Sequence, residues 1–125
     1  MAAGAGVLAS ALSSCATLPV LRTTAVGNTI PVDAQLFTSE VTALLLREKK
    51  LEYDILLVKT PGGFRALYML CTHNEAALSG NQFSILCPLH GSEFDFEGYP
   101  KKAPATERLR MFLVTEQDGK IVVHL

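Results

Sequence analysis

The sequence predicts an all-β domain, a small antiparallel β sandwich or barrel that carries one long, loop-rich insertion. Three observations lead to this fold class. Two pairs of β-rich segments flank tight turn motifs, a further segment alternates apolar and polar residues, and the stretch 71–108 shows no regular period. A long segment without periodicity inside a small domain is usually functional or is ordered by something other than packing.

Length and composition agree with one globular domain. A chain of 125 residues is long enough for one hydrophobic core and too short for two. Hydrophobic residues make up 49% and charged residues 18%, which favours a folded protein over a disordered one. The formal net charge is -1, and Lys and Arg do not cluster, so nothing indicates a nucleic-acid partner.

The N-terminal segment has no charged side chain before Arg22, and three interpretations compete for it. A transmembrane anchor needs about twenty strongly apolar residues, whereas this segment is weakly apolar and contains Pro19. A flexible terminus is the second interpretation. The third is an export signal, because "LSSC" (12–15) resembles a bacterial lipobox with Cys15 as the lipidated residue, although no Lys or Arg precedes it.

We favour the export signal. Residues 1–25 are therefore expected to be a signal-like or flexible segment outside the domain, which spans 26–125. Cys15 would be the lipidation site and the point of membrane attachment. The protein would then be exported, either periplasmic or anchored on the outer side of a bacterial inner membrane. A cytoplasmic location is the alternative if the segment is not a signal.

The segment 28–36 alternates apolar and polar residues around Pro31, as expected for an edge strand. The Leu-rich segment 41–48 could be helical, with Thr38 or Ser39 as its cap. It is short and lies beside predicted strands, so we predict a strand there as well.

Two β-hairpins follow from turn chemistry. The β-rich segments 53–60 and 64–70 flank a Pro-Gly-Gly sequence, and the segments 110–117 and 120–125 flank Asp118-Gly119. Asp-Gly between alternating apolar segments is among the strongest hairpin signals.

The insertion contains Cys71, His73, Cys87 and His90, each Cys/His pair being predicted on a tight loop that leaves a strand. With Cys15 far upstream, a disulfide framework is not expected, and the cysteines indicate a metal. Two loops side by side would bring two thiolates and two imidazoles together, which suits zinc or a mixed-ligand iron–sulfur cluster. Zinc fingers usually place both cysteines in one knuckle. One Cys and one His per loop therefore favours the 2Fe-2S cluster, with a structural zinc module as the alternative.

Residues 26–125 resemble Rieske 2Fe-2S domains. The resemblance rests on "CTH" (71–73), "CPLHGS" (87–92), "EFDFEG" (93–98) and "APATERL" (103–109), and the second box with its continuation is the most specific part. The boxes are separated by thirteen residues, 74–86, somewhat fewer than is usual in the family.

The resemblance implies one Rieske-type 2Fe-2S cluster per chain. Cys71 and Cys87 would bind the iron that stays ferric, and His73 and His90 the iron that accepts the electron. Ser92 would donate a hydrogen bond to a cluster sulfur, and both histidines should lie at or near the surface.

The sequence departs from the high-potential respiratory members at three positions. Ala76 and Leu89 stand where those members have cysteines that form a disulfide between the loops, and Phe94 stands where they have a tyrosine. Loop rigidity is therefore expected from packing of Pro88, Leu89 and Phe94 and from backbone hydrogen bonds to the sulfurs. With fewer hydrogen bonds to sulfur, the reduction potential should lie below that of the respiratory members.

The predicted function is one-electron transfer between a redox-protein donor and acceptor, as a stand-alone ferredoxin-like carrier or a small oxidoreductase subunit. No nucleophile–base pair and no second metal motif indicate catalysis on a substrate. Besides the zinc module, a lipid-anchored interaction domain whose metal only holds the loops together remains an alternative.

Overall fold

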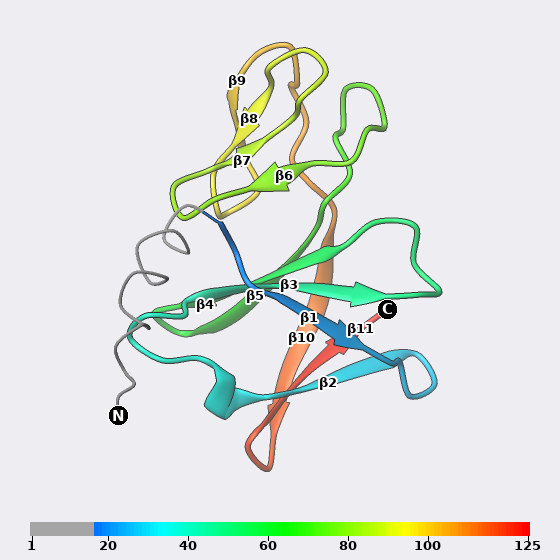
Figure 1. Ribbon diagram of the computed structural model, residues 1–125, viewed down its shortest axis with the longest axis vertical. Coiled ribbons are helices and arrows are strands. Elements are labelled where there is room, and N and C mark those ends of the chain that lie inside the picture. Colours follow the sequence, from blue (N-terminus) through cyan, green and yellow to red (C-terminus); the bar gives the residue numbers. More distant parts are fainter. Residues whose placement is uncertain (1–16) are drawn as a thin grey trace, which may run out of the picture.

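The computed structural model describes residues 17–125, whose strands form two sheets, with one short 3-10 helix η1 (Ala34–Leu36). Cys15 lies outside the described residues. The larger sheet fills the lower part of Figure 1 and the smaller sheet stands above it. The predicted all-β class is confirmed.

The larger sheet has the strand order β1-β3-β4-β5-β10-β11-β2. Its two edge strands, β1 and β2, are consecutive in the chain and joined only by residues 24–28, so the sheet curls into a nearly closed barrel (Figure 1). All pairs are antiparallel except β1 with β3. The strands are β1 (Val20–Thr23), β2 (Thr29–Asp33), β3 (Ala43–Glu48), β4 (Ile55–Thr60), β5 (Gly63–Tyr68), β10 (Met111–Gln117) and β11 (Lys120–His124).

Both predicted hairpins are confirmed. β4 and β5 pair as far as Thr60 opposite Gly63. β10 and β11 pair as far as Gln117 opposite Lys120, which leaves Asp118 and Gly119 as the turn, with φ of 51° and 78°. Positive φ at both central residues is the type I′ geometry, whose twist matches that of the strands.

The two less certain strands are also found. The Leu-rich segment forms β3, which lies between β1 and β4 in the barrel wall, and its Leu44 and Leu46 are buried. The Pro31 segment forms β2, an edge strand, where a residue without an N–H is tolerated.

The N-terminal boundary differs from the prediction. Residues 1–25 were expected to lie outside the domain, but β1 belongs to the barrel, pairing from Val20 with Leu45 to Thr23 with Glu48. Leu21 also packs against the barrel core. A four-residue strand that follows an uncharged segment has too short a pattern to be recognised in the sequence.

A buried carboxylate holds the link between β1 and β2. The side chain of Glu48 is almost fully buried, and its two oxygens accept hydrogen bonds from the backbone N–H groups of Ala25 (2.9 Å) and Lys50 (2.5 Å). These two bonds, led by the one from Ala25, lower the pKa of Glu48 despite its burial.

The insertion contains a small antiparallel sheet that the sequence did not predict, with the order β6-β7-β8-β9. Its strands have two or three residues each, too few to show a period of two. They are β6 (Ser79–Gly80), β7 (Ile85–Leu86), β8 (Glu93–Phe94) and β9 (Pro100–Lys102).

Two hydrophobic cores result. The first lies inside the barrel and includes Ile30, Leu46 and Ile121. The second lies between the outer face of the barrel wall and the small sheet, and it joins Leu56 and Leu67 of the wall to Ile85 and Phe94. The second core positions the two cysteines of the insertion, which are part of it. Within residues 17–125, no helix is both long enough and apolar enough to cross a membrane.

Candidate metal centre

The first ligand loop (71–76) and the second ligand loop (87–92) have the same backbone hydrogen-bond pattern. The N–H of Cys71 donates to the C=O of Ala76 (2.8 Å), and the N–H of Glu75 donates to the C=O of Cys71 (3.0 Å). In the second loop, the N–H of Cys87 donates to the C=O of Ser92 (2.8 Å) and the N–H of Gly91 to the C=O of Cys87 (3.1 Å). Each loop is thus a closed turn that begins with a cysteine.

The equivalence extends to the backbone conformation. The fifth residue of each loop has positive φ, 51° at Glu75 and 79° at Gly91. Glycine adopts this conformation without steric cost, whereas a residue with a Cβ does not. The second loop therefore contains the residue that its shape requires, and the first loop does not.

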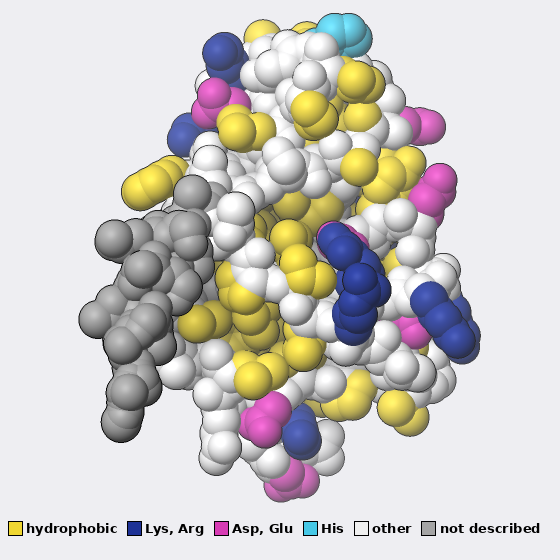
Figure 2. Space-filling model, in the orientation of Figure 1, with side chains coloured by type: hydrophobic (Ala, Val, Ile, Leu, Met, Phe, Trp, Pro, Cys, Tyr) yellow, Lys and Arg dark blue, Asp and Glu magenta, His cyan; other side chains and the backbone are white. Residues whose placement is uncertain are grey.

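The cysteines are buried and the histidines are exposed. Cys71 is 0% and Cys87 2% exposed, both within the second core, and both are free thiols. His73 and His90 are exposed, with ring centroids 5.9 Å apart. Figure 2 shows histidine surface (cyan) at the extremity of the molecule above the small sheet. The expected surface position of the histidines is confirmed.

A third segment, residues 103–108, is bound to both loops. The hydroxyl of Thr72 donates to the C=O of Glu107 (2.8 Å), and the N–H of Ala105 donates to Oγ of Ser92 (3.0 Å). The first bond is exposed and the second is buried. The sequence analysis did not identify Thr72, because a Thr in a loop gives no sign of its partner thirty-five residues away.

The first loop also contacts the barrel. The hydroxyl of Tyr53, between β3 and β4, donates to the C=O of Glu75 (3.3 Å). Burial, followed by the nearby carboxylates of Glu52 and Glu75, raises the pKa of Tyr53, which keeps its donor proton in place.

Ser92 and Phe94 lie at the base of the second loop, and both are 0% exposed. The bond from Ala105 uses a lone pair of the Ser92 hydroxyl and leaves its proton free to donate, as a role toward a cluster sulfur requires. Phe94 packs in the second core as expected. Leu89 does not, since it is 60% exposed, and Pro88 is exposed too. The expectation that these two stiffen the loop by packing is wrong, because the tip of a closed turn points away from the core.

The side chain of Asn74, a residue of the first loop, reaches the second loop. Its amide N–H donates to Nδ1 of His90 (2.6 Å), and its Oδ1 lies 3.8 Å from Sγ of Cys87. The sequence offered no reason to single it out, because its partners belong to the other loop.

The donor set suits a 2Fe-2S cluster. Each loop contributes one buried thiol and one exposed imidazole, so that the two loops together offer two of each, and a mixed-ligand cluster needs two of each. Among residues 17–125, no three or more His, Cys, Asp or Glu side chains form a group that could hold one metal ion. A structural zinc site uses four ligands around a single ion, and the zinc alternative is not supported.

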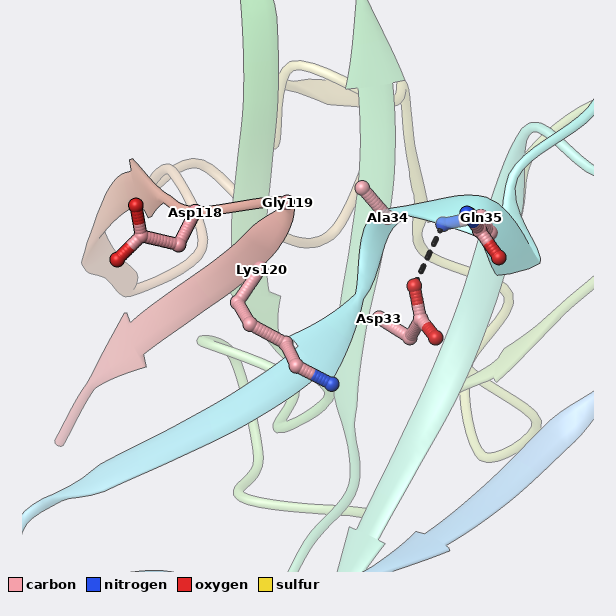
Figure 3. Close-up of a pocket in the computed structure, with 6 residues that line it drawn as sticks. All are labelled: Asp33, Ala34, Gln35, Asp118, Gly119 and Lys120. Carbon is pink, nitrogen blue, oxygen red and sulfur yellow. Dashed lines mark hydrogen bonds between the residues drawn. The ribbon is translucent and has the colours of Figure 1, made fainter.

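Two other features lie away from this centre. A surface pocket of about 390 Å³ is formed where the end of β2 meets the β10–β11 turn, and its polar residues include Asp33, Asp118 and Lys120 (Figure 3). There Asp33 accepts a hydrogen bond from the backbone N–H of Gln35 (3.0 Å), a local turn contact. His124, in the last strand, contacts Thr115 (2.8 Å) and is far from the loops in the fold.

Comparisons with known proteins agree with this centre. The profile of the Rieske [2Fe-2S] domain family matches residues 32–123. The anthranilate 1,2-dioxygenase ferredoxin subunit of Burkholderia cepacia is 36% identical over 64 residues, 48% of this chain, and the match spans only 59% of that subunit.

Two solved structures share the fold. One is the plasma membrane Rieske protein PetC3 of Synechocystis PCC 6803, with a TM-score of 0.53, 20% identity, and coverage of 79% of this chain and 88% of that one. The other is a chain in the complex of reduced oxygenase and oxidized ferredoxin of carbazole 1,9a-dioxygenase. Its TM-score is 0.57, with 24% identity and coverage of 78% and 93%.

The fold and the site thus define a small iron–sulfur protein with a mixed thiolate and imidazole donor set. The chain belongs to the Rieske [2Fe-2S] domain family. Its cofactor is a Rieske-type 2Fe-2S cluster, a group that takes up and releases one electron.

Proposed function

We propose that this chain is a ferredoxin-type electron carrier whose cluster is held by Cys71, Cys87, His73 and His90. The observation that carries the assignment is the division of these side chains between two environments, cysteines buried in the second core and histidines exposed at the end of the molecule.

The cluster, when bound, takes up and releases one electron. The chain's own residues decide where the electron can leave. The second core surrounds both thiols and excludes water from them. The exposed imidazoles provide the short route to the surface, because they reach solvent while the cysteines do not.

The direct test of this assignment is metal analysis together with EPR spectroscopy of the reduced protein. We expect two irons and two sulfides per chain and a mixed-ligand 2Fe-2S signal. Colourless protein with one zinc per chain would contradict the proposal.

We further propose that the electron acceptor is the oxygenase component of a dioxygenase system. The support is the ferredoxin relative, which is a subunit of such a system. The acceptor would dock at the tip of the second loop, where Leu89 is 60% exposed beside His90.

Docking can be tested with two matched substitutions. Leu89→Glu should slow re-oxidation of the reduced protein by an oxygenase component, because it places a charge at the centre of the contact. Phe83→Glu is the control, since Phe83 is 79% exposed but lies on the β6–β7 turn, at the opposite end of β7 from the second loop. Equal rates for the two variants would place the docking surface elsewhere.

The reduction potential is proposed to lie below that of the respiratory members. Ala76 and Leu89 cannot form a disulfide, and Phe94 has no hydroxyl to donate to sulfur. A redox titration that gives a potential among those of the respiratory members would contradict this.

Lipidation of Cys15, and with it export and membrane attachment, is a proposal that rests on "LSSC" (12–15) alone. Mass spectrometry of the protein from its native membrane fraction tests it. We expect a diacylglyceryl adduct on Cys15, lost in Cys15→Ser together with the membrane association. An unmodified Cys15 in soluble protein would contradict the proposal.

A further inference from the structure

The turn between β6 and β7 carries the most exposed large hydrophobic side chain of residues 17–125. This residue is Phe83, which is 79% exposed. Its turn is ordered by Asn81, whose Oδ1 accepts hydrogen bonds from the N–H groups of Phe83 (2.7 Å) and Ser84 (3.0 Å). A hydrophobic side chain that an ordered turn holds in water gains free energy when an apolar surface covers it.

The described part of the chain begins beside this turn (Figure 1). Leu18 packs against the second core, and its Cδ1 lies over β6, at the position where a Cβ added to Gly80 would come within 2.9 Å. Gly80 precedes Phe83 by three residues. The N-terminal segment therefore joins the domain next to the β6–β7 turn.

The proposed lipidation site is close to this junction. Cys15 precedes Leu18 by three residues, and three residues span at most about 11 Å. A lipid on Cys15 would thus hold a bilayer within reach of the β6–β7 turn, whatever path the intervening residues take. Phe83 is then an exposed aromatic side chain beside the point where the domain is attached to the membrane.

The two segments that meet here are uncharged. No Asp, Glu, Lys or Arg occurs in 17–21 or in 76–92. A bilayer that approached these segments would remove none of their side-chain charges from water, which would otherwise oppose the contact. Phe is also among the residues that proteins lying on a membrane bury at the boundary between head groups and acyl chains.

We propose that the β6–β7 turn contacts the lipid bilayer and that Phe83 inserts into its interfacial region. The inference rests on the proposed lipidation of Cys15, which supplies the attachment. One flexible attachment leaves the domain free to rotate, whereas a second contact at Phe83 fixes its orientation. The second ligand loop lies at the opposite end of β7, so this orientation leaves Leu89 and His90 open to a redox partner.

The test uses the lipid-carrying protein with its cluster, purified from the membrane fraction and reconstituted into phosphatidylcholine vesicles. The chain contains no tryptophan, so Phe83→Trp introduces a single fluorescent reporter at the turn. Bromine atoms on the acyl chains quench a tryptophan that touches them. We expect the emission of Phe83→Trp to be weaker in vesicles of brominated lipid than in vesicles of the same lipid without bromine.

Val26→Trp is the matched control. Val26 is 67% exposed and lies between β1 and β2, at the other end of β1 from Leu18. We expect its emission to be the same in both kinds of vesicle. The visible spectrum of the cluster verifies that each variant is folded.

The outcomes separate the inference from the proposal on which it rests. Equal emission of vesicle-bound Phe83→Trp with and without bromine would overturn the inference and leave the lipidation intact. Equal quenching of the two variants would also overturn it, because the domain would then have no fixed orientation. Protein that carries no lipid on Cys15 and does not sediment with vesicles would overturn both.

Discussion

The two ligand loops have one shape but are stabilised by different means. In the second loop, the residue with positive φ is Gly91, which adopts this conformation without steric cost. The loop is bound to residues 103–108 by a buried hydrogen bond to Ser92. In the first loop, Glu75 takes the left-handed conformation at a steric cost. That loop compensates with external contacts, an exposed bond from Thr72 and a bond from Tyr53 of the barrel.

The difference shows that two loops of one chain can adopt the same backbone conformation with different residues and different contacts. The second loop is specified largely by its own residues, in agreement with its stronger sequence motif. The first loop depends on its neighbours. Substitutions within the second loop should therefore have larger effects than matched substitutions within the first, except at the ligands, where the loops contribute equally.

The largest effect is expected at the ligands themselves. Replacing Cys71, His73, Cys87 or His90 singly by Ala should abolish the cluster, because one of the two irons would lose one of its two protein ligands. Visible absorbance and iron content measure the loss. His124→Ala should keep the full cluster, and a variant of either loop that also kept it would remove that residue from the ligand set.

The next largest effects are expected at Ser92 and Thr72, the two residues that bind the loops to residues 103–108. Ser92→Ala leaves the buried N–H of Ala105 without an acceptor, and we expect the free energy of unfolding to fall by about 1–3 kcal/mol. Thr72→Val removes an exposed bond that water can replace, and should cost at most about 1 kcal/mol. Urea unfolding followed by circular dichroism provides both values. A Thr72 variant that is the less stable of the two would reverse the ranking of the loops.

At the two residues with positive φ, Gly91 and Glu75, we expect substitutions to change the free energy of unfolding in opposite directions. Gly91→Ala should destabilise by about 1–2 kcal/mol, since a Cβ there meets no neighbouring atom and the cost is purely conformational. Glu75→Gly should stabilise by about 0.5–1 kcal/mol, because relief of the left-handed strain exceeds the entropy of the added glycine. The same urea unfolding measurements apply. If Glu75→Gly were destabilising, the side chain of Glu75 would have to make a contact that offsets its backbone cost.

The smallest effect concerns the support of the first loop by the barrel. The carboxylate of Glu48 accepts a hydrogen bond from the N–H of Lys50, in the segment that also contains Tyr53. Because the pKa of Glu48 is lowered in the folded protein, its stabilising contribution is present above the ordinary pKa of a glutamate. It is lost as the pH falls through the lower folded-state value.

We therefore expect the wild type to have a higher Tm than Glu48→Gln at neutral pH, and this difference to shrink in acid. Glu40→Gln, at an exposed position, serves as the control and should follow the wild type throughout. A difference that did not change with pH would assign the effect to the size of the side chain rather than to its charge.

The sequence by itself determined the central hairpins and the fold class, and it named the four proposed ligands. These features depend on residues close together in the chain: two Cys/His pairs, and turns whose residues impose φ and twist locally. The exposed histidines also followed from the sequence, through the resemblance of the two boxes to the Rieske family.

Only the tertiary structure decided which residues of different segments meet. The contact of Asn74 with His90, the anchors at Thr72 and Ser92, and the pairing of β1 with β3 all join parts of the chain whose sequence separation carries no signal. The exposure of Leu89 was likewise decided there, because a hydrophobic side chain at the tip of a turn points wherever the closed loop directs it. Turns and Cys/His pairs depend on residues that are adjacent in the chain, so the sequence reveals them. The contacts between the two loops and their neighbours join distant segments and exist only once the chain has folded.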